Sequence, residues 1–206
     1  MEDNVKKNAG EEDSVQKKHT TPGGNLLAYL HDLVWLLTAI ILIFLLGFRA
    51  VIVSGPSMEN TLVDGDYLLL VGNLLYRNPE QGDIVVAAKD SFRGGEPIVK
   101  RVIATEGQTV DIDFIRGTVS VDGTVLEEPY IKNLTHMQEG VEFPLTVAEG
   151  CIFVMGDNRG DSKDSRSPEI GLIDTREILG KAIFLFLPGT AKGTQPRDFA
   201  RIGVLS

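Results

Sequence analysis

The feature that most constrains this chain is an uncharged apolar run near its start. Residues 33–48, "LVWLLTAIILIFLLGF", contain no charged side chain, and apolar residues extend the run on both sides. Asp32 and Arg49 lie near its ends, where side chains reach the lipid interface, so a span of about 20 residues or slightly more can cross a bilayer. We predict one transmembrane helix over residues 26–53.

A cleaved signal peptide and a buried core helix are the other interpretations of this run. It is longer than the apolar region of a signal peptide, and no small-x-small cleavage site follows it, so a retained anchor is favoured.

The residues before the run are polar and mixed in charge, which predicts a disordered tail over residues 1–25. Four lysines precede the run, whereas only Arg49 closely follows it. Because positive residues favour the cytoplasmic side, we expect the tail in the cytoplasm and residues 54–206 outside it.

Composition excludes some kinds of site. The chain has 206 residues, 43% of them hydrophobic, which is enough for one moderate domain plus an appendage. Its formal net charge of -9 argues against a nucleic-acid surface. Cys151 is the single cysteine, so neither an intrachain disulfide nor a cysteine-rich metal site can form.

After residue 53 the pattern changes to short segments rich in Val and Ile, bounded by Gly, Pro, Asp or Asn. This predicts a mostly β domain of antiparallel sheets or a barrel-like arrangement. The Asp122-Gly123 pair between "TVSV" and "TVL" predicts a type I′ hairpin. "IDTREILGK" predicts a short helix.

The segment "VIVSGPSMENTL", residues 51–62, places Gly55, Pro56 and Ser57 in succession. Glycine permits unusual backbone geometry, proline fixes φ, and the serine then presents a hydroxyl and a free amide. A nucleophile can be mounted in this way, and a plain turn uses the same residues.

Alternation in "PIVKRVIA" places Lys100 on a strand face between Ile98 and Val102, with Arg101 on the opposite face. An exposed edge lysine and a buried lysine both fit this pattern. Burial would lower the pKa of Lys100, as a lysine general base requires.

Residues 155–171, "MGDNRGDSKDSRSPEIG", form a polar segment without apolar periodicity. A solvated linker, a calcium loop and a functional loop held by Asp–Arg pairs are the alternatives. The spacing of an EF-hand is absent.

Together these three segments resemble the bacterial type I signal peptidases, which are membrane-anchored serine proteases with a Ser-Lys dyad. "SGPSMENTL" is similar to the family's nucleophile box, "KRVIATEG" to its lysine box, and "GDNRGDSKDSR" to its third box. The resemblance covers roughly Leu33 to Gly189. It assigns the nucleophile to Ser57 and the general base to Lys100.

The match has departures. Asn60 stands where the family usually has proline, and "ATEGQT" keeps only Gly107 of the family pattern after the lysine box. Some members have a serine oxyanion donor where this chain has Gly55. The oxyanion site is therefore assigned to the Ser57 amide and a backbone N–H near Gly55.

The resemblance also implies supporting roles. Ser162 would hydrogen-bond and orient Lys100, and ion pairs would hold the third box, formed by Asp157, Asp164, Arg101 and Arg166. Neutral Lys100 would deprotonate Ser57 to form an acyl-enzyme, without metal or cofactor. The implied partners are membrane lipid and preprotein signal peptides, cut after small-x-small sites. The implied location is a bacterial plasma membrane, with the N-terminus cytoplasmic.

Rival functions remain. Self-cleaving repressor-type proteins share Ser-Lys chemistry but are soluble, which the apolar span disfavours. A catalytically inactive membrane-anchored β domain that binds exported proteins is the alternative from another class. A Ser-His enzyme would need His136, which no flanking motif marks as a base.

Overall fold

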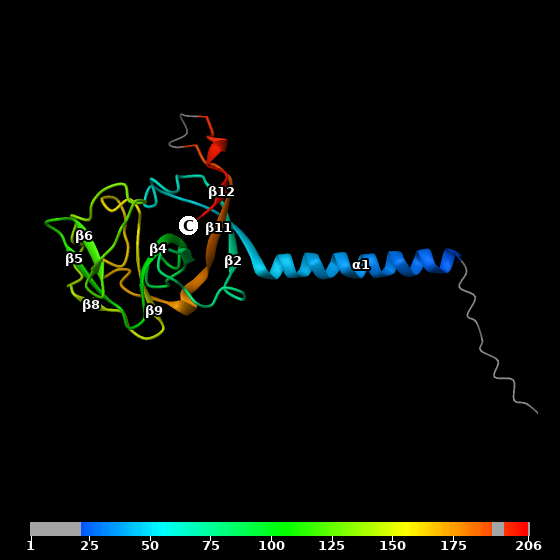
Figure 1. Cartoon of the computed structure of the whole chain (residues 1–206), viewed down its shortest axis with the longest axis horizontal. Coiled ribbons are helices and arrows are strands. Elements are labelled where there is room, and N and C mark those ends of the chain that lie inside the picture. The colour runs from blue at the N-terminus through cyan, green and yellow to red at the C-terminus, as the bar shows by residue number, and fades with distance from the viewer. Residues whose placement is uncertain (1–21, 191–195, 206) are drawn as a thin grey trace, which may run out of the picture. The chain divides into compact units, whose positions relative to one another are not determined.

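The computed structural model describes residues 22–190 and 196–205 of the chain. It divides into two compact units, residues 1–42 and 43–206, which we describe separately. Figure 1 shows the β-rich unit as a curled set of strands.

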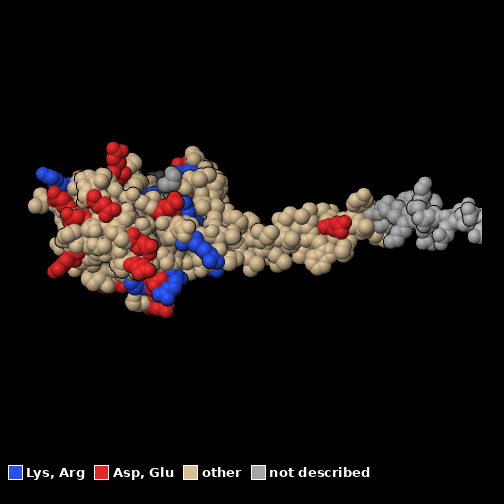
Figure 2. Space-filling model, turned by 60° about the horizontal axis from the view of Figure 1, so that its bottom comes forward, with Lys and Arg blue, Asp and Glu red and all other residues tan. Residues whose placement is uncertain are grey.

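Helix α1 (Pro22–Gly47) is the long N-terminal element. Its residues Leu26–Gly47 are long and apolar enough to cross a membrane, at 22 residues with a mean hydropathy of 2.2. Figure 2 shows this helix covered almost entirely by residues other than Lys, Arg, Asp and Glu. The segment therefore has the length and composition of a single membrane span.

The expected boundaries of this helix need correction at both ends. The helix starts at Pro22, inside the predicted tail, where proline suits the first helical turn. It ends at Gly47, and β1 (Phe48–Ile52) follows instead of further helix. The apolar residues of β1 pair with β2 (Tyr67–Gly72), and hydropathy alone does not distinguish such a strand from a helix end. The rest of the predicted tail, residues 1–21, lies outside the described residues.

The larger sheet contains eight strands, all of whose pairings are antiparallel. Its order is β1-β2-β11-β3-β4-β9-β10, with β12 paired to β11. The remaining members are β3 (Ile84–Ala87), β4 (Ile98–Thr105), β9 (Cys151–Met155), β10 (Ile173–Asp174), β11 (Ile178–Leu187) and β12 (Gly203–Val204). Pairing of β2 with β11 brings the two ends of the domain together.

The smaller sheet has the order β7-β6-β5-β8. Its strands are β5 (Thr109–Asp113), β6 (Thr118–Val121), β7 (Thr124–Val125) and β8 (Leu145–Thr146). Asp122 and Gly123 both have positive φ, at 50° and 80°, and join β6 to β7. The predicted type I′ hairpin is confirmed.

Two short 3-10 helices complete the described elements, η1 (Thr175–Glu177) and η3 (Phe199–Arg201). η1 lies within "IDTREILGK", where a short helix is predicted, and Asp174 caps it. The mostly β, antiparallel fold with one N-terminal apolar helix is confirmed.

The core forms because alternate residues of the strands turn inward. Leu68 and Leu70 of β2 are fully buried and pack with Met58 and Leu62 from the segment after Ser57. A second apolar cluster lies around Val102 of β4 and Val154 of β9. The segment that contains Ser57 is thus fastened by its own apolar residues to the sheet that contains Lys100.

Candidate active site

Ser57 and Lys100 meet although 43 residues separate them in the sequence. Lys100 lies in β4 opposite Val85 of β3, and its Nζ lies 2.7 Å from Ser57 Oγ. Lys100 is only 4% exposed, so of the two alternatives from the sequence the structure has the buried lysine. Among the described residues, no carboxylate lies within ion-pair distance of its Nζ.

Burial changes the proton affinity of this lysine. Removal from water lowers the pKa of Lys100 from 10.5 to about 8, and the negative charge of Asp164 opposes the shift only in part. The amine is therefore substantially neutral near pH 8, which is the form that can accept a proton from a hydroxyl.

Ser57 lies in a loop that we define as the serine loop, residues 53–66. The loop turns at Gly55, whose φ of +88° is readily adopted only by glycine. The Gly55 N–H donates to Asp64 Oδ1 at 2.9 Å and is engaged. This corrects the expectation that Gly55 supplies an oxyanion donor. The Ser57 N–H has no hydrogen-bond partner within the described ranges.

Asn60 explains one departure from the family pattern. Its φ is +98°, which a proline ring cannot adopt. Asparagine is one of the residues that tolerate positive φ, and its Nδ2 donates to the Tyr130 carbonyl at 2.9 Å. The turn after Ser57 is therefore built differently here, and Asn60 ties it to a neighbouring segment.

The third box forms the loop of residues 156–167, which packs against the serine loop. The Asn158 N–H donates to the Ser57 carbonyl at 3.0 Å, and its Nδ2 donates to the Pro56 carbonyl at 3.1 Å. A Cβ at Gly156 would lie 2.4 Å from the Ser57 carbonyl oxygen and 2.2 Å from Ser162 Oγ. Only glycine permits this close approach.

Arg101 and Asp157 form a bidentate pair on the opposite side of β4 from Lys100. Arg101 Nε and a terminal nitrogen donate to the two carboxylate oxygens at 3.0 and 2.9 Å. The residues are 1% and 0% exposed, and the Arg101 guanidinium also lies 4.1 Å from the Tyr130 ring centre. Thr61 Oγ1 donates to Asp157 at 2.5 Å, so one carboxylate joins all three boxes.

Asp164 pairs with Arg166 in the same loop. Arg166 donates to both Asp164 oxygens at 2.8 Å, and the Gly156 N–H donates to the same carboxylate at 3.0 Å. Burial alone would raise the pKa of Asp164, but hydrogen bonds from Arg166 and the Arg166 charge hold this pKa below its ordinary value. Asp164 is thus a fixed negative charge near Lys100.

Ser162 occupies a different place from the one expected. Its Oγ donates to Asp164 Oδ2 at 2.9 Å, and no hydrogen bond joins it to Lys100 in the described part of the chain. A charged carboxylate two residues away is the stronger acceptor, which explains the choice of partner. The hydrogen-bond partner of Ser162 is therefore Asp164 rather than the expected Lys100.

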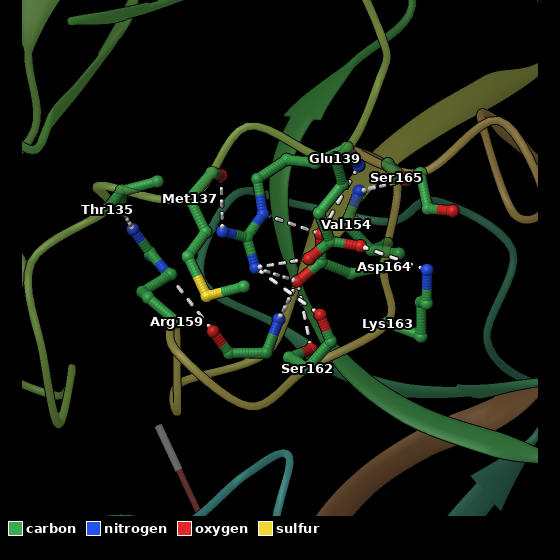
Figure 3. Close-up of polar contacts among 12 residues, drawn as sticks. Thr135, Met137, Glu139, Val154, Arg159, Ser162, Lys163, Asp164 and Ser165 are labelled. Atoms are coloured by element: carbon green, nitrogen blue, oxygen red, sulfur yellow. Dashed lines mark hydrogen bonds and ion pairs between the residues drawn. The ribbon is translucent and has the colours of Figure 1, made fainter. Parts of the chain in front are cut away.

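Glu139 is a neighbour that the sequence analysis missed. Figure 3 shows its side chain close to that of Asp164, with dashed contacts between the loop residues. One oxygen lies 3.4 Å from Arg166, and the other is buried 3.9 Å from Lys163 Nζ without a hydrogen bond to any described residue. Burial and the Asp164 charge raise the pKa of Glu139. No local motif marks it, because only the folded chain brings it to the loop.

Arg159 is a second missed residue. It is buried and donates to both Glu128 oxygens, to Thr135 Oγ1 at 2.7 Å and to the Gly156 carbonyl at 3.1 Å. These contacts fasten residues 128–135 to the base of the third box.

A cleft of about 230 Å³ opens at the Ser57–Lys100 pair. Apolar walls come from the end of β1, the serine loop, β3, β4 and the segment between β3 and β4, and charged residues also line the cleft. The apolar members are Val51, Ile52, Val53, Val86, Phe92, Ile98 and Val99; the charged members besides Lys100 are Arg93, Glu96, Asp161 and Lys163. The volume is smaller than that of most drug-sized pockets, about 300–1,000 Å³, and suits short side chains.

His136 does not join this cluster. It is exposed, and its Nδ1 lies 3.0 Å from the Phe114 carbonyl oxygen. Among the described residues no group of three or more His, Cys, Asp or Glu side chains could hold a metal ion.

The family model described as "Signal peptidase, peptidase S26" matches residues 26–187. The chain belongs to the signal peptidase family. As a member it is a serine peptidase, a hydrolase of the class that removes signal peptides.

Individual signal peptidases match over most of their length. Signal peptidase I of Bacillus licheniformis is 33% identical, covering 84% of this chain and 95% of that protein. Signal peptidase I T of Bacillus subtilis is also 33% identical, covering 88% and 94%. A crystal structure of a signal peptidase I from Enterococcus faecalis is 30% identical and covers 50% of this chain and 96% of that one, with a TM-score of 0.42.

Proposed function

We propose that this signal peptidase cleaves preproteins through a Ser57–Lys100 dyad and an acyl-enzyme, after small-x-small sites. The observation that carries the proposal is the 2.7 Å contact between Ser57 Oγ and a buried Lys100 that has no carboxylate partner among the described residues. A serine hydroxyl needs a base to attack a peptide bond, and a desolvated lysine can serve as one near neutral pH.

In the first step, Ser57 Oγ loses its proton to neutral Lys100 Nζ and bonds to the scissile carbonyl carbon. The carbonyl oxygen becomes an oxyanion, to which the Ser57 N–H donates a hydrogen bond. The C–N bond then breaks, and protonated Lys100 gives its proton to the leaving amine. The products of this half are the new N-terminus of the mature protein and an ester on Ser57.

In the second half, neutral Lys100 takes a proton from a water molecule that attacks the ester. Lys100 then returns the proton to Ser57 Oγ as the signal peptide leaves with a free carboxylate. Lys100 thus acts as base and acid in both halves, and no other titratable side chain has to enter the cleft.

The supporting residues hold this geometry. Asn158 fixes the carbonyls on either side of the turn at Ser57, and Asp157 with Arg101 fixes Thr61 further along the serine loop. Asp164 and Arg166 hold the third box together and join it to residues 137–141, and Ser162 donates to the Asp164 carboxylate.

The cleft supports the proposed preference for small residues. Its apolar walls and volume of about 230 Å³ favour short apolar side chains beside the scissile bond. Ser57 follows the apolar span closely along the chain, which would keep it near a bilayer. A preprotein anchored by its own apolar segment would meet it at a raised effective concentration. We place the catalytic domain outside the cytoplasm of a bacterium, with the N-terminus inside.

The test is cleavage of a purified preprotein by the full chain in detergent, followed by sequencing of the product's new N-terminus. Ser57→Ala and Lys100→Ala should each abolish cleavage, and the wild type should cut after a small-x-small site. Full activity of Lys100→Ala would refute the dyad. Absence of cleavage by the wild type across several preproteins would favour the inactive binding domain.

A further inference from the structure

Backbone hydrogen bonds join the two ends of the serine loop, and the buried carboxylate of Asp66 lies at this junction. The Val53 N–H donates to the Asp66 carbonyl at 2.8 Å, and the Gly65 N–H donates to the Val53 carbonyl at 2.9 Å. The Asp66 side chain is 0% exposed and accepts hydrogen bonds from the Val63 and Gly189 N–H groups at 2.8 and 2.6 Å. A buried carboxylate of this kind needs a cation to offset the loss of hydration.

That cation comes from the end of the chain, 135 residues away. Arg201 donates to the two Asp66 oxygens at 3.0 and 2.6 Å. The planar guanidinium matches a carboxylate in this bidentate geometry, which a lysine cannot reproduce. Arg201 lies in η3, beyond residue 187, where the match to the family model ends.

The same guanidinium reaches the turn that follows Ser57. Its second terminal nitrogen donates to the Thr61 carbonyl at 3.2 Å, while Thr61 Oγ1 donates to Asp157. Thr61 is thus held from both sides, by the C-terminal segment and by the third box. Its own N–H donates to the Met58 carbonyl at 3.1 Å, one residue after Ser57.

The C-terminal segment is itself fastened to the sheet. β12 pairs with β11, with Val204 opposite Phe184 and Gly203 opposite Leu185. The Leu205 N–H adds a hydrogen bond to the Ile183 carbonyl at 3.0 Å. Arg201 therefore lies beside a segment that is hydrogen-bonded to β11, while its side chain contacts the serine loop.

We propose that Arg201 is a positioning residue for catalysis: the C-terminal segment braces the serine loop and so keeps Ser57 Oγ within reach of Lys100. This role rests on the proposed function in one respect, the identity of Ser57 as the nucleophile. Because a misplacement of about 1 Å can cost about 100-fold in rate, a brace on the loop acts on turnover more than on substrate affinity.

The experiment compares Arg201→Ala with Arg197→Ala in the full chain in detergent. Arg197 lies in the same segment and donates to the Pro188 carbonyl at 2.7 Å, with no described contact to the serine loop. With a preprotein as substrate, Arg201→Ala should lower kcat by about 10- to 100-fold, with KM within about twofold of wild type. Arg197→Ala should leave both constants within about twofold. Arg201→Lys, which keeps the charge, should recover part of the loss.

Hydrogen exchange supplies a measurement that does not depend on catalysis. The Val63 and Gly65 amides should exchange at least about tenfold faster in Arg201→Ala than in the wild type or Arg197→Ala. Unchanged exchange, faster exchange with unchanged kcat, or equal losses of activity in the two variants would each overturn the proposal. Ser57→Ala, measured beside these variants, separates this proposal from the proposed function. Full activity of Ser57→Ala would refute Ser57 as the nucleophile, whereas the exchange rates would still test whether Arg201 holds the serine loop.

Discussion

The two faces of strand β4 carry two buried cations in opposite situations. Lys100 and Arg101 are adjacent and are 4% and 1% exposed. Arg101 has a bidentate carboxylate partner, whereas the described contact of Lys100 Nζ is a neutral hydroxyl. Arg101 is therefore a permanent charge that holds the fold, and Lys100 is a cation that the fold disfavours.

The difference between Lys100 and Arg101 shows how one strand can hold a structural ion pair on one face and a candidate general base on the other. A buried charge is tolerated when a partner and hydrogen bonds compensate for lost hydration. Without that compensation the group loses its proton more easily, which is the property a general base needs. The strand's alternation separates the two environments by a single residue.

The strongest test of the Lys100 face is Lys100→Met, which keeps an unbranched apolar side chain one atom shorter and removes the amine. We expect kcat to fall by at least about 1,000-fold, comparable to losses of other catalytic bases. The thermal midpoint should stay the same or rise, because an uncompensated buried amine is removed. His136→Ala is the control and should cleave like the wild type. A Lys100→Met protein that unfolds would mean that the lysine is structural.

On the Arg101 face, Arg101→Met should have the reverse effect. It leaves the Asp157 carboxylate buried without its cation, so we expect a loss of about 3–5 kcal/mol in the free energy of unfolding. Chemical denaturation monitored by fluorescence or circular dichroism measures this loss. If the variant is as stable as the wild type but inactive, then Arg101 has the chemical role and the comparison fails.

The pH profile tests the environment of Lys100 directly. With a pKa of about 8, kcat/KM should rise about tenfold per pH unit below pH 8 and level off above it. The folded pKa lies below the ordinary value of 10.5, so the unfolded chain binds the proton more tightly. Stability should therefore also rise with pH between about 8 and 10.5 from this group. A plateau that extends down to pH 6 would contradict a lysine base.

The smallest expected effect comes from the charges behind Lys100. Asp164 raises the pKa of Lys100 and Arg166 lowers it, so Asp164→Asn removes the first influence and leaves the second. The acid limb of the kcat/KM profile should move to lower pH. Glu139→Gln should move it in the same direction by less, since Glu139 is a weaker influence on Lys100. A shift to higher pH in Asp164→Asn would show that the carboxylate does not act through its charge.

Local sequence patterns were sufficient to predict much of the secondary structure and the fold class of this protein. The apolar span, the β-rich domain and the hairpin at Asp122-Gly123 follow from hydropathy and turn chemistry, which depend on neighbouring residues. Resemblance between three short motifs and a known family then indicated Ser57 and Lys100. The end of the apolar helix could not be predicted in this way, because the apolar residues of β1 suit a helix and a strand equally.

Tertiary structure alone decided the environment of each group. Alternation left Lys100 either buried or exposed, and only the packing of the serine loop and third box over β4 buries it. Contacts within the serine loop engage the Gly55 N–H with Asp64, and contacts within the third box turn Ser162 to Asp164. The folded chain also brings Glu139 and Arg201 to places that no motif marks. Proton affinity and hydrogen-bond partners depend on what surrounds a group in space, and those neighbours come from segments that are distant in the sequence.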